Sequence, residues 1–93
     1  MIIGILTVLI EIPSSFSLKE KRRVLNSVKS KLKNRFNISI AEVGEKDIWN
    51  RAEIGIAIIS DNSSFCNEQL GNVIEFIEKF SDIVVLSVNQ EII

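Results

Sequence analysis

The pattern of apolar and polar residues divides the chain into six segments of secondary structure. An almost unbroken apolar run at residues 2–12 predicts a strand that is covered on both faces, and Pro13 ends it. Shorter apolar or alternating runs predict three further strands, at residues 38–43, 51–60 and 83–92.

Two segments repeat their apolar residues with the period of a helix. The first runs from about Leu18 to about Asn34, and it begins at Ser17 and Glu20, which form the S-x-x-E pattern of a capping box. The second helix follows the capping residues at 61–64. Its buried stripe is expected to comprise Cys66, Leu70, Val73, Ile74 and Ile77.

The order βαββαβ predicts an α+β fold of the ferredoxin-like type, formed by one domain over residues 1–93. Right-handed crossovers place both helices on one face of a four-stranded antiparallel sheet, whose usual strand order is 4-1-3-2. This order puts the first and third strands, which are the two most apolar, at the centre of the sheet.

The sheet face without helices is expected to be apolar as well. If Ala52, Ile54 and Ile56 face the helices, alternation turns their neighbours to the open face. We predict that this open face carries Ile3, Ile5, Thr7, Leu9, Glu53, Gly55, Ala57, Ile59, Ile83, Val85, Ser87 and Asn89. Large apolar patches usually mark interfaces. We therefore expect homodimerisation or partner docking through Ile3, Ile5, Ala57 and Ile59.

Positive charge is concentrated in the first helix. Residues 17–35 contain eight Lys or Arg and one acid, whereas the rest of the chain contains three bases and eleven acids. At 100° per residue, Lys19, Arg22, Lys29 and Lys33 form one stripe, with Arg23 beside it. The stripe spans about 21 Å, and five phosphate contacts along it would give a log–log salt slope of roughly −4.

The cations at the start of this helix oppose the helix dipole. A cation at the positive end costs roughly 0.3–1 kcal/mol, yet four of them lie there: Lys19, Lys21, Arg22 and Arg23. Lys21 falls near the apolar stripe and is expected to reach water along its stem.

Three explanations of this charge stay open. A phosphate near the helix start would compensate the positive charge. In this case we expect Lys19, Lys21, Arg22, Arg23, Lys29 and Lys33 to contact a nucleic acid or another anion. Alternatively, Glu68, Glu75 and Glu78 of the second helix neutralise it, or the basic face is simply solvated.

Trp49 lies in the polar turn between the second and third strands. It either stacks on a base or covers the end of the core. An RNA surface of the RRM type on the sheet is disfavoured, because the two central strands contain no aromatic residue.

The residue types present argue against catalysis. The chain has no histidine and no glycine-rich phosphate motif, and Cys66 lies on an apolar stripe. We therefore expect no catalytic residue, no cofactor and no metal site. The turn at residues 13–17 is similar in position to the phosphate loop of acylphosphatase-like enzymes but lacks its arginine, so an enzyme acting on a phosphate compound is a third possibility.

Location is also constrained by the sequence. A lone cysteine fits a reducing cytoplasm. The apolar N-terminal run lacks the basic region and cleavage site of a signal peptide, and it is too short to span a membrane as a helix. We expect a cytoplasmic protein with no membrane partner.

Three separated segments resemble the YlxP-like family of small bacterial proteins. They are SLKEKR, RFNISIAEV and DIWNRAEIG, and they occur in the family's order and spacing. The resemblance implies a ferredoxin-like fold and a dimer of unknown function, with no accepted catalytic residue. In many bacteria the family's genes lie among those for translation initiation and ribosome maturation. The basic positions that match the motif are Lys19, Lys21 and Arg22.

These observations favour a small non-catalytic protein that binds ribosomal RNA or a ribosomal subunit through its basic helix. The alternative is a protein-interaction or dimerisation module with no nucleic-acid role.

Overall fold

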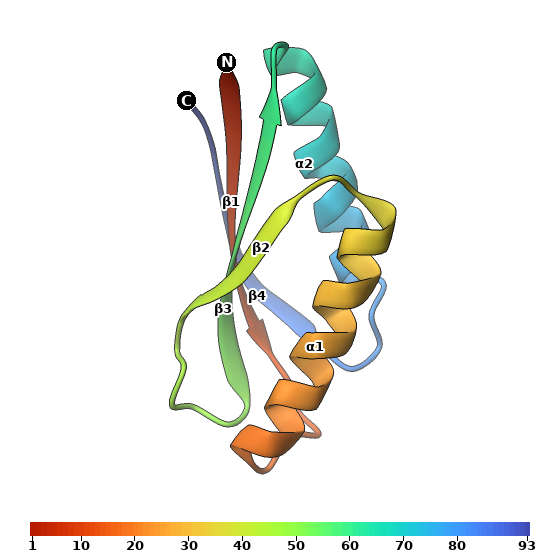
Figure 1. Ribbon diagram of the computed structural model, residues 1–93. Coiled ribbons are helices and arrows are strands. Elements are labelled where there is room, and N and C mark those ends of the chain that lie inside the picture. Colours follow the sequence, from red (N-terminus) through yellow and green to blue (C-terminus); the bar gives the residue numbers. More distant parts are fainter.

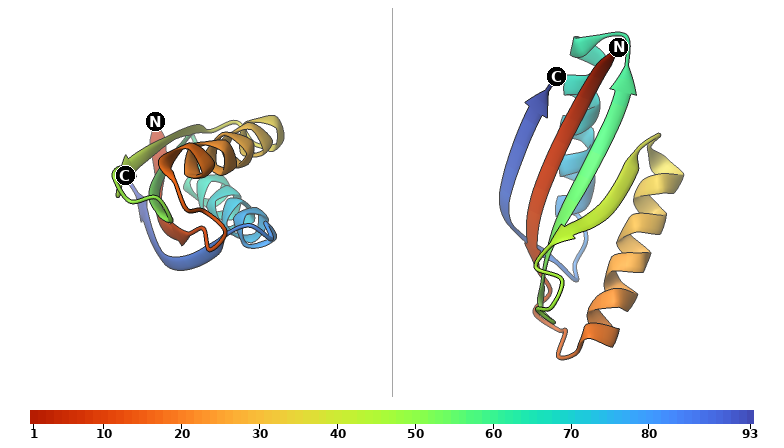
Figure 2. Two further views of the ribbon diagram at one scale, coloured as in Figure 1. Left: turned by 90° about the horizontal axis from the view of Figure 1, so that it is seen from below. Right: turned by 60° about the vertical axis from the view of Figure 1, so that its left-hand side comes forward.

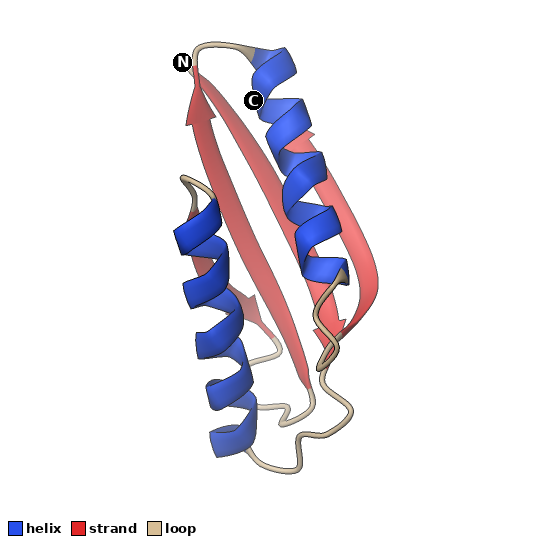
Figure 3. Ribbon diagram, turned by 90° about the vertical axis from the view of Figure 1, so that its right-hand side faces the viewer, coloured by secondary structure: helices blue, strands red, loops and turns tan.

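The computed structural model describes residues 1–93 and confirms the predicted α+β, ferredoxin-like architecture. One antiparallel sheet has the order β2-β3-β1-β4, which is the predicted order read from the other edge. Both helices cover the same face of this sheet and run antiparallel to each other (Figures 1 and 3). The elements are β1 (Ile2–Glu11), α1 (Leu18–Arg35), β2 (Ser39–Gly44), β3 (Arg51–Ser60), α2 (Ser63–Glu78) and β4 (Val84–Ile92).

The core lies between the two central strands and the apolar stripes of the helices. Alternate residues of β1 and β3 are buried because they face the helices, as the alternation predicts. Their partners on α2 are four of the five predicted stripe residues, whereas Ile74 is half-buried. The largest fully buried side chains include Leu6, Ile10, Ile12, Leu32, Ile54, Ile56, Leu70 and Ile77.

Both helices begin with side-chain caps, as the sequence predicts. Ser17 Oγ accepts a hydrogen bond from the Glu20 N–H at 3.1 Å, and Glu20 Oε2 accepts one from the Phe16 N–H at 2.9 Å. Asn62 Oδ1 accepts a hydrogen bond from the Phe65 N–H at the start of α2. These bonds satisfy amide groups that have no partner inside a helix.

The predicted open face is correct for the central strands but wrong for the first half of β4. Ser87 pairs with Leu9 and Asn89 with Thr7, so both lie on the open face. Ile83, however, is buried in the core, and Val85 packs against it. The cause is a bulge, since Val85 pairs with Ile10 and Ser87 with Leu9, which leaves Leu86 without a partner. One extra residue reverses the alternation on either side of it.

The helices cover only one side of the sheet, and the other side is bare (Figure 2). The short β2 and the longer β4 form the two edges of the sheet. α1 lies on the β2 side of the helical layer and α2 on the β4 side (Figures 2 and 3).

The bulge predicts an unusual tolerance to deletion. Removing Leu86, which is 44% exposed and unpaired, restores regular alternation without moving any other pair. We expect the free energy of unfolding to fall by less than about 2 kcal/mol, measured by urea denaturation. Removing Thr7 from β1 should prevent folding, because every residue before it then turns to the wrong face. Equal damage by both deletions would contradict the assigned bulge.

Candidate nucleic-acid interface

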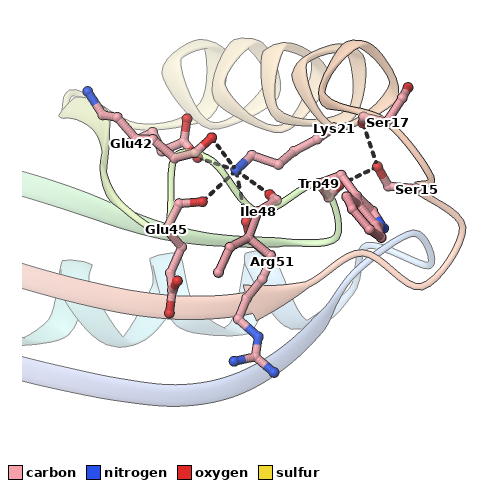
Figure 4. Close-up of polar contacts among 9 residues, drawn as sticks. Ser15, Ser17, Lys21, Glu42, Glu45, Ile48, Trp49 and Arg51 are labelled. Carbon is pink, nitrogen blue, oxygen red and sulfur yellow. Dashed lines mark hydrogen bonds and ion pairs between the residues drawn. The ribbon is translucent and has the colours of Figure 1, made fainter.

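The ammonium group of Lys21 is buried beneath α1, and five oxygen atoms surround it (Figure 4). Its Nζ donates to the carbonyl oxygens of Glu45, Ile48 and Arg51 at 2.8–2.9 Å and of Lys46 at 3.3 Å. Oε2 of Glu42, on β2, lies 2.8 Å from the same nitrogen and has no other hydrogen-bond donor. These contacts tie the first turn of α1 to β2 and to the loop that joins β2 to β3.

The prediction that Lys21 reaches water is wrong, because its exposed fraction is 3%. An ammonium group has three protons, and the surrounding oxygens already use them. Lys21 therefore offers nothing to an external anion in this structure. In the sequence, only the position of Lys21 near the apolar stripe indicated that it could be buried. Its acceptors are mostly backbone carbonyls, which side-chain patterns do not reveal.

The remaining cations of α1 lie at the surface. Lys19, Arg22, Arg23 and Lys33 are exposed, and Lys29 is half-buried. Their stripe lies on the side of α1 away from α2, since Lys31 and Arg35, on the opposite side, contact α2. The structure thus keeps five of the six predicted contact residues together on one outward surface.

The acids of α2 form no direct ion pair with this surface. Lys21–Glu42 is the single ion pair within 4 Å in the structure. Neutralisation of the basic helix by Glu68, Glu75 and Glu78 at longer range stays a prediction. At the helix start itself, the carboxylate of Glu20 lies near the positive end of the dipole, where a negative charge is favourable.

The loop between β2 and β3 presents Trp49 next to the start of α1. Ser15, which is buried, donates its hydroxyl to the Trp49 carbonyl oxygen at 2.5 Å and to that of Ser17 at 3.1 Å (Figure 4). Trp49 is 53% exposed and is not one of the buried core residues. Its two interpretations, as a cover for the end of the core and as a stacking platform for a base, both stay predictions.

A surface hollow of about 440 Å³ lies at the β1–α1 turn. Lys19 and Arg23 line it together with Glu20 and two serines. The carboxylate competes there with any anion, and no histidine is available for proton transfer. The arrangement offers electrostatic contacts to an anion.

The open sheet face has the predicted apolar centre. Ile3, Ile5 and Ala57 are half-buried there, and Ile59 is 66% exposed. Ile5 and Ala57 also line a shallow hollow of about 280 Å³, formed with residues of β2.

No three His, Cys, Asp or Glu side chains gather in an arrangement able to hold a metal ion. Neither helix is long and apolar enough to cross a membrane.

The comparisons with known proteins agree with the resemblance found in the sequence. A family described as "Protein of unknown function (DUF503)" matches residues 3–90. The chain belongs to the DUF503 family. It is 42% identical over 67 residues to "Uncharacterized protein YlxP" of Bacillus subtilis (strain 168), a match that covers 72% of this chain and 73% of that protein. No activity is assigned by either description.

The structure also adds residues that the sequence analysis did not single out. Glu42 pairs with Lys21, and three phenylalanines, Phe36, Phe76 and Phe80, form a row beside α1. The spacing of residues in the sequence could have indicated this row. Phe76 and Phe80 are four residues apart, as are Lys31 and Arg35, and this spacing places each pair on one helix face.

Removal of the buried ammonium group tests its structural role. Lys21→Met leaves the Glu42 carboxylate oxygen and several carbonyls without a donor, and we expect a loss of about 3–5 kcal/mol in the free energy of unfolding. The matched substitution Lys33→Met, at an exposed position of the same helix, should change it by less than about 0.5 kcal/mol. Urea denaturation measures both values, and similar effects of the two substitutions would refute the role.

Proposed function

We propose that this protein binds RNA through the sugar–phosphate backbone, using the outward cations of α1, and that it catalyses no reaction. The observation that carries the proposal is the set of seven cations on α1 other than Lys21, none of which has an ion-pair partner within the protein. Uncompensated positive charge of this kind repels itself, and it is offset when phosphates approach.

The geometry of the stripe supports a contact with an extended anion. Lys19, Arg22, Lys29 and Lys33 occupy one side of a straight helix, along about 21 Å. Arg23 lies beside them. Contacts with phosphates position a nucleic acid but do not read its sequence, so we expect recognition by charge and shape. The gene neighbourhood implied by the family resemblance supports ribosomal RNA or a ribosomal subunit as the target.

Titration of labelled ribosomal RNA, and separately of purified ribosomal subunits, across a salt series tests the proposal. The variant Arg22→Gln, Lys29→Gln, Lys33→Gln removes three contacts. It should weaken binding about tenfold or more at physiological salt and should reduce the log–log salt slope on single-stranded RNA by about 2.

The matched control changes the net charge equally without touching α1. Ser63→Asp, Ser64→Asp and Ser81→Asp, all at exposed positions in or near α2, also lower the charge by three units. This control should bind as the wild type does. Absence of binding by the wild type, or equal weakening by both triple variants, would refute the α1 surface as the contact.

We propose in addition that the open sheet face joins two copies of the chain. Ile59, which is 66% exposed, lies there beside the half-buried Ile3, Ile5 and Ala57. An apolar side chain this exposed contributes to stability only when another surface covers it. A dimer formed this way leaves both basic helices free on the outside, because they lie on the other face of the sheet.

Analytical ultracentrifugation tests the dimer. Ile59→Asp should shift the protein to monomers without loss of folding, because the side chain is already solvated in a single chain. Phe65→Asp, at a 49% exposed position on α2, is the control and should leave the dimer intact. A monomeric wild type would contradict this second proposal and would leave the first unaffected.

A further inference from the structure

A row of three aromatic rings lies where α1 and α2 meet. Phe36 follows α1, Phe76 belongs to α2 and Phe80 follows α2. The rings of Phe36 and Phe76 are 5.7 Å apart, those of Phe76 and Phe80 are 5.5 Å apart, and both pairs meet edge to face. All three residues pack against the core and are half-buried. They are therefore partly accessible at the surface.

Two cations of α1 lie over this row. Lys31 Nζ is 5.5 Å from the centre of the Phe80 ring, and Arg35 Cζ is 5.4 Å from that of Phe76. Both distances are within the range of cation–π attraction. Neither cation has an ion-pair partner. The rings therefore hold the cations in place, and the charges stay available for a ligand.

Two adjacent hollows flank the row and share Phe76 and Lys79. One has a volume of about 200 Å³ and is also lined by Lys31 and Phe80. The other, of about 220 Å³, extends toward Arg35 and the Glu75 carboxylate. Together the two hollows are lined by three cations and one acid.

We propose that this groove, formed by Lys31, Arg35, Phe36, Phe76, Lys79 and Phe80, binds unpaired nucleotides of single-stranded RNA. The inference rests on the proposed RNA-binding function and names the form of RNA that is bound. Bases stack on aromatic rings and on the guanidinium plane of arginine, while lysines contact the phosphates. The groove supplies each of these groups.

The position of the basic stripe on the same helix favours a nucleic acid over an acidic peptide. Lys31 and Arg35 lie on the side of α1 opposite Lys29 and Lys33, so a strand that passes over the outer face of the helix reaches both surfaces. An acidic peptide would match the cations, but it would make no use of ring faces. A paired duplex would match the stripe, but its bases are not free to enter the groove.

Aromatic NMR spectra of the full chain, labelled at phenylalanine, test the groove. The chain contains five phenylalanines, and Phe16 and Phe65 lie outside the groove as internal controls. Addition of an oligoadenylate of about twelve nucleotides should shift the signals of Phe36, Phe76 and Phe80 only. A duplex RNA of the same length should leave them in place.

Affinity measurements on a variant complete the test. Phe80→Leu keeps an apolar side chain but removes the ring, so it should weaken binding of the single strand about tenfold while leaving the duplex affinity unchanged. Binding of RNA without shifts at the three rings would overturn the groove and leave the α1 stripe standing. Absence of all RNA binding would overturn both proposals. Shifts caused by poly-glutamate and not by RNA would overturn the nucleotide as the occupant.

Discussion

The buried ammonium group of Lys21 fixes how the basic helix sits on the sheet. It joins the first turn of α1 to the Glu42 carboxylate on β2 and to four carbonyl oxygens at the β2–β3 loop. A charge removed from water this completely is stable only while its partners surround it. Rotation of α1 about its axis would break these five contacts. The Lys21 cage, formed by the Glu42 carboxylate and the four carbonyl oxygens, therefore determines which of the other cations face outward.

That constraint resolves much of the conflict between the charges of α1 and its dipole. Of the four cations at the helix start, Lys21 is neutralised internally, and Glu20 supplies a carboxylate at the positive end. Lys19, Arg22 and Arg23 stay uncompensated and exposed. The same helix turns Lys31 toward Phe80, which follows α2, and Arg35 toward Phe76 of α2. The uncompensated charge therefore borders two different surfaces, a polar stripe and an aromatic groove, which are the surfaces that we propose for a single strand of RNA.

The fold was predictable because alternation in β1 and β3 and the helical stripes of α1 and α2 all indicate one core. Three features were not. The Lys21 cage depends on backbone carbonyls that converge only in the folded loop. The bulge at Leu86 has no glycine or proline to mark it, so simple alternation placed Val85 on the wrong face. The aromatic groove depends on the contact of two helices, although the equal spacing of Lys31 and Arg35 and of Phe76 and Phe80 indicates the faces involved.

Acetylation footprinting of the lysines, with and without single-stranded ribosomal RNA, tests both the burial of Lys21 and the contact of RNA with the outward cations of α1. Each lysine reports its own accessibility by mass spectrometry. We expect that Lys21 is unreactive in both states, that RNA protects Lys19, Lys29 and Lys33, and that Lys46, in the β2–β3 loop, reacts equally in both. Rapid modification of Lys21 would contradict the cage. Unchanged modification of the three stripe lysines in the presence of bound RNA would contradict the interface.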